Sequence, residues 1–240
     1  MLPKVTIQLN VIMDAKVQAE KQSEEAVVDL HIFSDTICPW CLIGKTKLDR
    51  ALAGISEAGR IRPRWHAFEL NPNMPSEGMK RREYRAKKFG SWERSRQLDA
   101  EVSAAGEQMG IDFRHDLIEF TPNTRASHRL AWWAREKRQH ELVDRLLRAY
   151  FCEGLDVGSI SVLAELAGQV GLDQEAAFAF LKTSEGNDEV AYESATAQQA
   201  GVRGVPAILS GGKLVFSGAQ PVAEIRSRLI KLLETSGENT

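Results

Sequence analysis

The stretch Val27-Val-Asp-Leu-His-Ile-Phe-Ser-Asp-Thr-Ile-Cys-Pro-Trp-Cys-Leu-Ile43 carries the strongest local signal in this chain of 240 residues. Its first part, residues 27–33, is rich in β-branched and apolar side chains, which is typical of a strand. Ser34-Asp35-Thr36 ends this run, and apolar positions at helical spacing follow Cys38. Pro39 suits the first position of a helix, where no backbone N–H is needed. The pattern predicts a strand that passes directly into a helix, with both cysteines at the junction.

Cys38 and Cys41 are three residues apart and therefore lie about one helical turn apart on one face. The thiolate form of a cysteine attacks a disulfide, and a helix N-terminus favours that form through its unpaired N–H groups and its dipole. We therefore expect Cys38 to be an exposed nucleophile and Cys41 a more buried thiol that resolves the mixed disulfide. Trp40 lies between them and is expected to offer an apolar contact surface to a substrate.

Strand patterns continue at residues 61–70 and return at residues 207–210 and 213–216, which flank a Gly-Gly turn typical of a hairpin. Pro221 opens a last amphipathic helix. Between these parts, helical periodicity dominates, including a helix expected from Asn123 or Thr124 through Arg138. The sequence predicts an α/β protein with a thioredoxin-like core, β-α-β followed by β-β-α, and an inserted all-helical subdomain.

The predicted domain boundaries follow from these patterns. Residues 1–26 form an N-terminal extension or linker, with an alternating strand signal near its start. Residues 27–71 and 201–240 form the thioredoxin-like domain, and residues 72–200 form the helical insertion.

Several segments together resemble the FrnE-type branch of the DsbA superfamily, and they run in that family's order from about residue 27 to the C-terminus. They are Ser34-Asp-Thr-Ile-Cys-Pro-Trp-Cys-Leu-Ile-Gly-Lys45, Phe68-Glu-Leu-Asn-Pro72, Asn123-Thr-Arg-Ala-Ser-His-Arg-Leu130, Ala149-Tyr-Phe-Cys-Glu-Gly154, Gly201-Val-Arg-Gly-Val-Pro206 and Ser217-Gly-Ala-Gln-Pro221.

This resemblance implies a dithiol–disulfide exchange activity on protein or small-molecule disulfides, with Cys38 and Cys41 as catalytic residues. It implies that Pro206 is a cis-proline packed against the dithiol, that the backbone of Val205 pairs with substrate, and that Pro39 and Trp40 assist. Asn71 matches a family position near the site and is a candidate for substrate binding.

Two positions depart from the family's pattern. Ile32 stands six residues before Cys38, where thioredoxin and DsbA carry a buried acid, so proton transfer for Cys41 is expected to involve Asp35 or water. Ala207 follows Pro206 where relatives often carry a bulky aromatic residue, which is expected to widen the floor of the site.

Composition limits the other function classes. Three cysteines exclude a disulfide framework and a four-cysteine zinc site, and we expect no metal. No apolar run approaches the roughly 18–20 residues that span a bilayer, and the N-terminus is a weak signal-peptide candidate, so a cytoplasmic protein without membrane contact is expected. No cofactor is expected, with glutathione left open as a co-substrate and a homodimer left open as the assembly.

The basic stretch Lys80-Arg-Arg-Glu-Tyr-Arg-Ala-Lys-Lys-Phe89 is interpreted as a solvated helix face and not as a nucleic-acid site, because the net charge is −2. An acidic substrate or partner remains a milder alternative. Cys152 is interpreted as a buried structural thiol. Two other function classes stay open: a glutathione-dependent isomerase or transferase of the 2-hydroxychromene-2-carboxylate isomerase or kappa class, and a non-catalytic peptide-binding or chaperone module.

Overall fold

The structure, a computed structural model, describes residues 27–237. The predicted extension over residues 1–26, with its strand signal, lies outside the described residues.

A four-stranded mixed sheet forms the centre of the fold, with the strand order β2-β1-β5-β6. Its strands are β1 (Val28–Ser34), β2 (Ile61–Ala67), β5 (Ala207–Ser210) and β6 (Lys213–Ser217). β1 runs parallel to β2 and antiparallel to β5, with Ile32 opposite Ile208 in the second pair. Burial alternates along β1, and Leu30 and Ile32 are among its most buried side chains, as the period of a strand with one face in the core requires.

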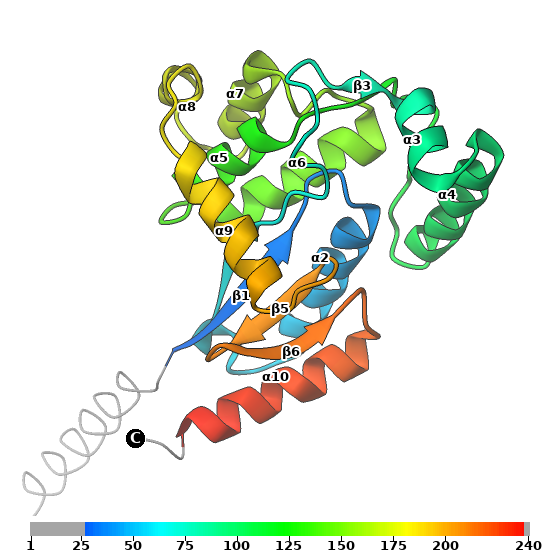
Figure 1. Ribbon diagram of the computed structural model, residues 1–240. Coiled ribbons are helices and arrows are strands. Elements are labelled where there is room, and N and C mark those ends of the chain that lie inside the picture. Colours follow the sequence, from blue (N-terminus) through cyan, green and yellow to red (C-terminus); the bar gives the residue numbers. More distant parts are fainter. Residues whose placement is uncertain (1–26, 238–240) are drawn as a thin grey trace, which may run out of the picture.

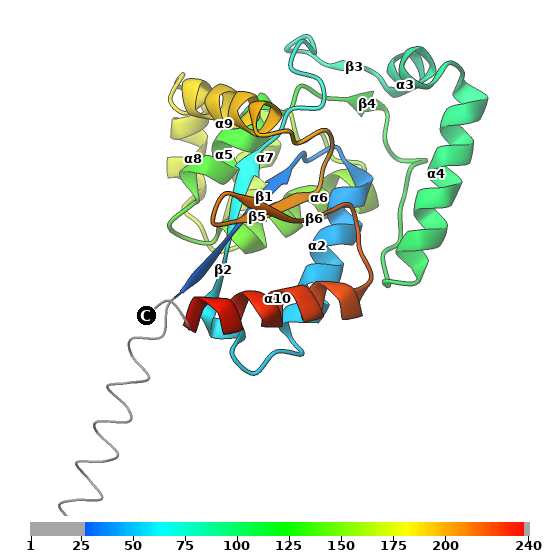
Figure 2. The ribbon, with the colours of Figure 1, turned by 60° about the horizontal axis from the view of Figure 1, so that its bottom comes forward.

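Two helices of the core lie against each other beside the sheet, α2 (Pro39–Leu52) and α10 (Val222–Gly237), as Figure 2 shows. A short 3₁₀ helix, η1 (Ala58–Arg60), precedes β2. The order β1-α2-β2 and then β5-β6-α10 confirms the predicted thioredoxin-like core.

The segment between β2 and β5 is mainly helical (Figure 1). Its helices are α3 (Arg81–Phe89), α4 (Trp92–Glu107), α5 (Arg125–Trp133), α6 (Gln139–Glu153), α7 (Ile160–Gln169), α8 (Gln174–Leu181) and α9 (Asn187–Gln199). Two-residue strands, β3 (Met79–Lys80) and β4 (Phe120–Thr121), pair antiparallel within it, so the expectation of an entirely helical insertion is wrong in this detail. In both views, α3 and α4 stand apart from the other helices of the insertion.

The helix expected to run through Arg138 ends earlier, at Trp133. A turn follows, and Gln139 then opens α6 with its side chain turned to the outer strand β2. Its Oε1 accepts the N–H of Trp65 at 2.9 Å and its Nε2 donates to the carbonyl of Trp65 at 2.9 Å. The turn thus lets one side chain satisfy two backbone groups at the edge of the sheet, which an uninterrupted helix would not allow.

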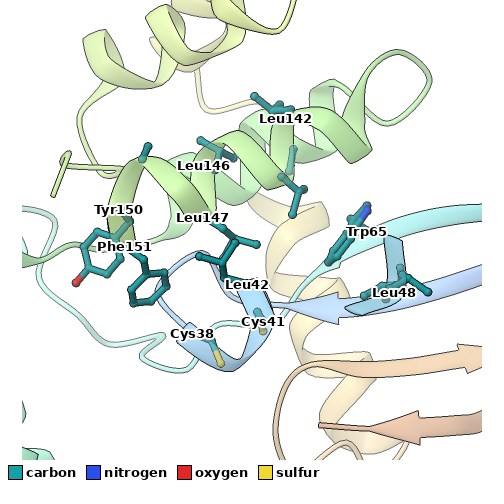
Figure 3. Packing of buried hydrophobic residues seen from close by; sticks show 14 of the residues in the cluster. Cys38, Cys41, Leu42, Leu48, Trp65, Leu142, Leu146, Leu147, Tyr150 and Phe151 are labelled. Atoms are coloured by element: carbon teal, nitrogen blue, oxygen red, sulfur yellow. The ribbon is translucent and has the colours of Figure 1, made fainter. Parts of the chain in front are cut away.

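The largest hydrophobic core joins the thioredoxin-like core to the insertion. Leu42 of α2 faces Leu147 of α6 in Figure 3, and both side chains are fully buried. Among the described residues, no helix combines the length and the apolar composition needed to cross a membrane.

Candidate active site

Cys38 is the residue that immediately precedes α2, and Pro39 occupies the first helical position. The turn is closed by backbone bonds from the N–H of Cys38 to the carbonyl of Asp35 and from the N–H of Cys41 to the carbonyl of Cys38, both at 3.0 Å. Figure 3 shows both cysteines at this end of α2. Both are free thiols. The strand-to-helix junction predicted from the sequence therefore brings the two thiols together at a helix N-terminus.

The two thiols differ less in exposure than the sequence suggested. Cys38 is 5% exposed and Cys41 is 1% exposed. The expectation of an exposed Cys38 is therefore wrong, because little of this residue is accessible to solvent. Cys38 nevertheless lines a cleft.

The loop before β5 lies against the dithiol. The Val205–Pro206 peptide bond is cis, and the Sγ atom of Cys38 lies 3.5 Å from the carbonyl oxygen of Val205. Gly44 of α2 makes this approach feasible, because a Cβ atom on it would lie 2.8 Å from Cγ of Pro206. Ala207 does not line the cleft at Cys38 and packs instead with Phe68 and its neighbours.

The surroundings of Cys41 control its proton. Burial raises the pKa of the Cys41 thiol well above its usual value, and the neighbouring Cys38 raises it further. Hydrogen bonds from the Ser34 hydroxyl and from the backbone N–H of Asp35 act in the opposite direction, because they stabilise the thiolate. Ser34 therefore belongs to the site. Its position at the end of β1, beside the dithiol, was the only signal in the sequence that pointed to it.

A buried acid does lie behind the dithiol, although not on β1. The side chain of Asp35 is 0% exposed, while Ile32 occupies the apolar core. The Asp35 carboxylate accepts the N–H of Leu70 at 2.8 Å and that of Ile37 at 3.3 Å. Its Oδ1 also lies 3.4 Å from Nε2 of the buried His128 of α5.

A small cavity of about 20 Å³ opens beside this pair and is lined in part by Ser34, Thr36, His128 and Glu193. A volume of this size accommodates about one water molecule. The cavity brings together polar groups from β1, α5 and α9, and Ser34 is the member of this lining that also acts on the pKa of Cys41. Sequence reasoning missed His128, although it stands within one of the segments that carried the family resemblance.

A cleft of about 270 Å³ opens in front of the dithiol. Cys38, Pro39 and Trp40 form one end, and Trp40 is 41% exposed, as expected for a contact surface. The insertion supplies the opposite wall, with the apolar side chains of Phe89, Leu98, Val102 and Phe151 and the basic side chains of Arg81, Arg85 and Lys88. Figure 3 shows the rings of Tyr150 and Phe151 at the end of α6 nearest to Cys38.

Asn71 does not line this cleft. Its Oδ1 accepts the hydroxyl of Tyr84 at 2.7 Å and the ammonium group of Lys88 at 3.1 Å. Asn71 therefore holds two residues that do line the cleft, and its predicted contact with substrate stays a prediction. Cys152 is partly buried near the end of α6, and burial raises the pKa of its thiol.

The family model of the DSBA-like thioredoxin domain matches residues 29–230. The chain belongs to this family. The match confirms the resemblance to the DsbA superfamily that the ordered segments indicated, while the FrnE-type branch stays a prediction.

Individual proteins are also similar to this chain in sequence or structure. The uncharacterised protein YwbO of Bacillus subtilis is 26% identical over 80% of this chain and 91% of its own length. The crystal structure of the probable DsbA oxidoreductase SCO1869 from Streptomyces coelicolor is 28% identical, with a TM-score of 0.76 over 89% of this chain and 91% of that one. DsbM of Pseudomonas aeruginosa, described as a cytosolic disulfide reductase and also solved with GSH, is 19% identical, with a TM-score of 0.61 over 86% of this chain and 99% of that one. The likeness to DsbM shows the fold alone.

Proposed function

We propose that the protein is a dithiol–disulfide oxidoreductase that uses Cys38 as the nucleophile and Cys41 as the resolving thiol. The observation that carries this proposal is the pair of free thiols at the N-terminus of α2, beside the carbonyl of Val205 and at the end of an open cleft. Membership of the DsbA-like family supports it.

The reaction runs in two exchange steps. The Cys38 thiolate attacks one sulfur of a disulfide R–S–S–R′, which forms a Cys38–S–R bond and releases R′–S⁻, which takes up a proton from solvent. Cys41 then loses its proton and attacks the sulfur of Cys38, which forms the Cys38–Cys41 disulfide and releases R–S⁻. Two electrons pass from the protein to the substrate, and the reverse sequence oxidises a dithiol.

The local geometry assigns different parts to the two thiols. Cys38 lines the cleft, whereas Cys41 does not. Burial favours the protonated form of Cys41, and hydrogen bonds from the Ser34 hydroxyl and the Asp35 N–H stabilise the thiolate that forms when the proton leaves. A thiol of raised pKa attacks only when it loses its proton, so Cys41 acts after the mixed disulfide has formed. Glutathione is one thiol that would regenerate the reduced pair.

The test is reduction of a model disulfide by the purified protein with dithiothreitol as electron donor. Cys38→Ser is expected to abolish turnover. Cys41→Ser, reduced beforehand, freed of dithiothreitol and then mixed with the model disulfide, is expected to trap a mixed disulfide on Cys38 that mass spectrometry detects. Cys152→Ser serves as the control and is expected to leave turnover unchanged. Full activity of Cys38→Ser would reject the proposal.

The same variants separate the alternatives. Turnover that needs glutathione but not Cys41 would indicate a glutathione-dependent isomerase or transferase. Binding of unfolded clients that survives loss of both cysteines would indicate a peptide-binding module. The cytoplasmic location expected from the sequence stays a prediction, which fractionation of cells that express the protein would test.

A further inference from the structure

The cleft is lined by two arginines, Arg81 and Arg85, that share a single carboxylate partner within the described residues. Nη2 of Arg81 donates to Oδ2 of Asp99 at 2.8 Å, and Nη2 of Arg85 donates to Oδ1 of the same carboxylate at 2.6 Å. Two guanidinium groups therefore share one anion, and the cluster keeps one net positive charge. Burial lowers the pKa of Arg85 although Asp99 lies beside it, which shows that this charge is poorly solvated.

The titratable neighbours among the described residues do not remove the excess charge. Burial lowers the pKa of His115 to about 4 and raises the pKa of Tyr150 to about 12, so both are neutral at pH 7. Glu101 also lines the cleft, but its salt bridge within the described residues is a 3.9 Å contact with the exposed Arg94 and not with Arg81, Arg85 or Lys88.

Lys88 adds a second cation at the rim. Its ammonium group donates to the hydroxyl of Tyr84 at 2.6 Å and to Oδ1 of Asn71 at 3.1 Å, and neither acceptor is a carboxylate. Within the described part of the chain, no carboxylate forms a salt bridge with it. The basic stretch is thus not only a solvated face, because part of it faces into the cleft.

The cleft connects these cations to the nucleophile. Cys38 and Trp40 line the same cleft as Arg85 and Lys88, and much of the remaining lining is apolar, with Leu70, Phe89, Leu98, Val102 and Phe151. A molecule that fits such a cleft has three parts. It places a sulfur atom at Cys38, an apolar group against the apolar lining and an anionic group near Arg85 and Lys88. Short, charge-assisted hydrogen bonds to such an anion would compensate the buried charge.

We propose that the cleft selects disulfide substrates that carry a carboxylate beside an apolar group, and that Arg85 and Lys88 determine this preference. The inference rests on the proposed oxidoreductase function and names its substrate class. The carboxylate belongs either to a small-molecule disulfide or to an acidic residue of a protein substrate, and the chemistry of recognition is the same.

The experiment compares two small aromatic disulfides as oxidants of the reduced protein. 5,5′-Dithiobis(2-nitrobenzoate) carries carboxylates and 4,4′-dithiodipyridine is neutral at pH 7.5. The measured quantity is the ratio of their second-order rate constants, anionic over neutral, so that differences in thiol reactivity cancel.

Lys88→Gln is expected to lower this ratio about fivefold and Arg85→Gln about tenfold, because each loses a charge-assisted contact. Arg85→Gln leaves Asp99 paired with Arg81, so the variant keeps a neutral, folded cluster. Lys87→Gln is the matched control, since Lys87 is an exposed neighbour that does not line the cleft, and its ratio is expected to stay within about 1.5-fold at 0.15 M salt.

The outcomes separate the two proposals. Cys38-dependent reaction with both disulfides and an unchanged ratio in Lys88→Gln and Arg85→Gln would overturn the inference and leave the oxidoreductase function standing. Absence of Cys38-dependent reaction with either disulfide would overturn the function itself. Disulfide-linked peptides with Glu or Lys beside the cysteine show whether the recognised carboxylate belongs to a protein or to a small molecule. A preference for the Glu peptide that Lys88→Gln abolishes assigns the carboxylate to protein substrates. A charge effect confined to the small disulfide assigns it to small molecules.

Discussion

Gly44 of α2 and Pro206 of the loop before β5 approach so closely that a Cβ atom on Gly44 would lie 2.8 Å from Cγ of the proline ring. Contacts of real Cβ atoms are longer, so even the smallest added side chain has to displace the loop. This loop carries the carbonyl of Val205 beside Cys38. The position of Gly44 therefore fixes the distance between the nucleophile and the backbone next to it.

Gly44→Ala is expected to reduce the rate of disulfide exchange about tenfold or more and to destabilise the fold by roughly 1–3 kcal/mol, the usual cost of overpacking. Stopped-flow kinetics and urea unfolding measure the two effects. Gly59→Ala is the control, because no atom of the described part of the chain lies within 4 Å of its added Cβ, and it should change neither quantity. Equal rates in the two variants would contradict the argument.

Asp35→Ala is expected to lower the free energy of unfolding by roughly 2–4 kcal/mol, because it removes the acceptor of two backbone N–H groups, those of Leu70 and Ile37. Urea unfolding measures this loss. The exposed Asp116 pairs with Arg114 at the surface, so Asp116→Ala should change stability by less than about 0.5 kcal/mol. A similar, small effect of both substitutions would show that the buried carboxylate has no structural role.

Resolution of the mixed disulfide is expected to accelerate with pH. Since the pKa of Cys41 is raised by burial, its thiolate fraction grows about tenfold for each pH unit below that pKa, and the rate follows. Ser34→Ala removes a hydrogen bond that stabilises the thiolate, so it should shift the profile to higher pH and slow the step at pH 7. Single-turnover release of the second thiol measures this rate, and Ser76→Ala, at an exposed position, is the control. A pH-independent rate would refute the assignment of Cys41.

Stability is expected to fall in mild acid through His115. Its pKa is lowered by burial to about 4, whereas it titrates near 6.5 in the unfolded chain. The unfolded state therefore binds more protons between these values, and stability decreases as pH falls from about 6.5 to 4.

Among residues 27–237, neither ring nitrogen of His115 has a hydrogen-bond partner, and the ring stacks on Phe113. His115→Phe keeps the aromatic contact and removes the titration, so the loss of stability between pH 7.5 and pH 5 should be smaller in the variant, by up to about 2 kcal/mol. Urea unfolding at the two pH values tests this, with the value at pH 7.5 as the internal reference. An unchanged acid loss would exclude His115 as its source.

Structural elements that have a short-range sequence pattern were predictable from the sequence. The alternation around Leu30, the proline at the start of α2 and the Gly-Gly turn of the hairpin each have a short-range signal, and together they define the core. The strands β3 and β4 carry no such signal, because two residues are too few to show a period. The turn between α5 and α6 is followed by a contact of Gln139 with Trp65 of β2, a long-range contact that periodicity does not encode.

The residues of the candidate site also fall into two groups, those that the sequence predicts and those that it does not. Cys38, Cys41 and Pro206 stand in recognisable motifs, and the structure brings them together, although their roles remain predictions. Arg85 and His128 come from helices whose positions against the dithiol arise only on folding. A basic residue such as Arg85 looks like a surface residue in sequence, and its inward direction follows from its bond to Asp99.

The insertion between β2 and β5 supplies the charged and aromatic wall of the cleft, while the thioredoxin-like core supplies the sulfur atoms and their immediate hydrogen-bond donors. Under the proposed function, the reduction potential of the dithiol and the choice of substrate are therefore encoded in separate stretches of the chain. Substitutions in α3 and α4 are free to change the preferred partner without altering the driving force of the exchange, so relatives with one redox core have a physical route to diverge into enzymes for different thiols.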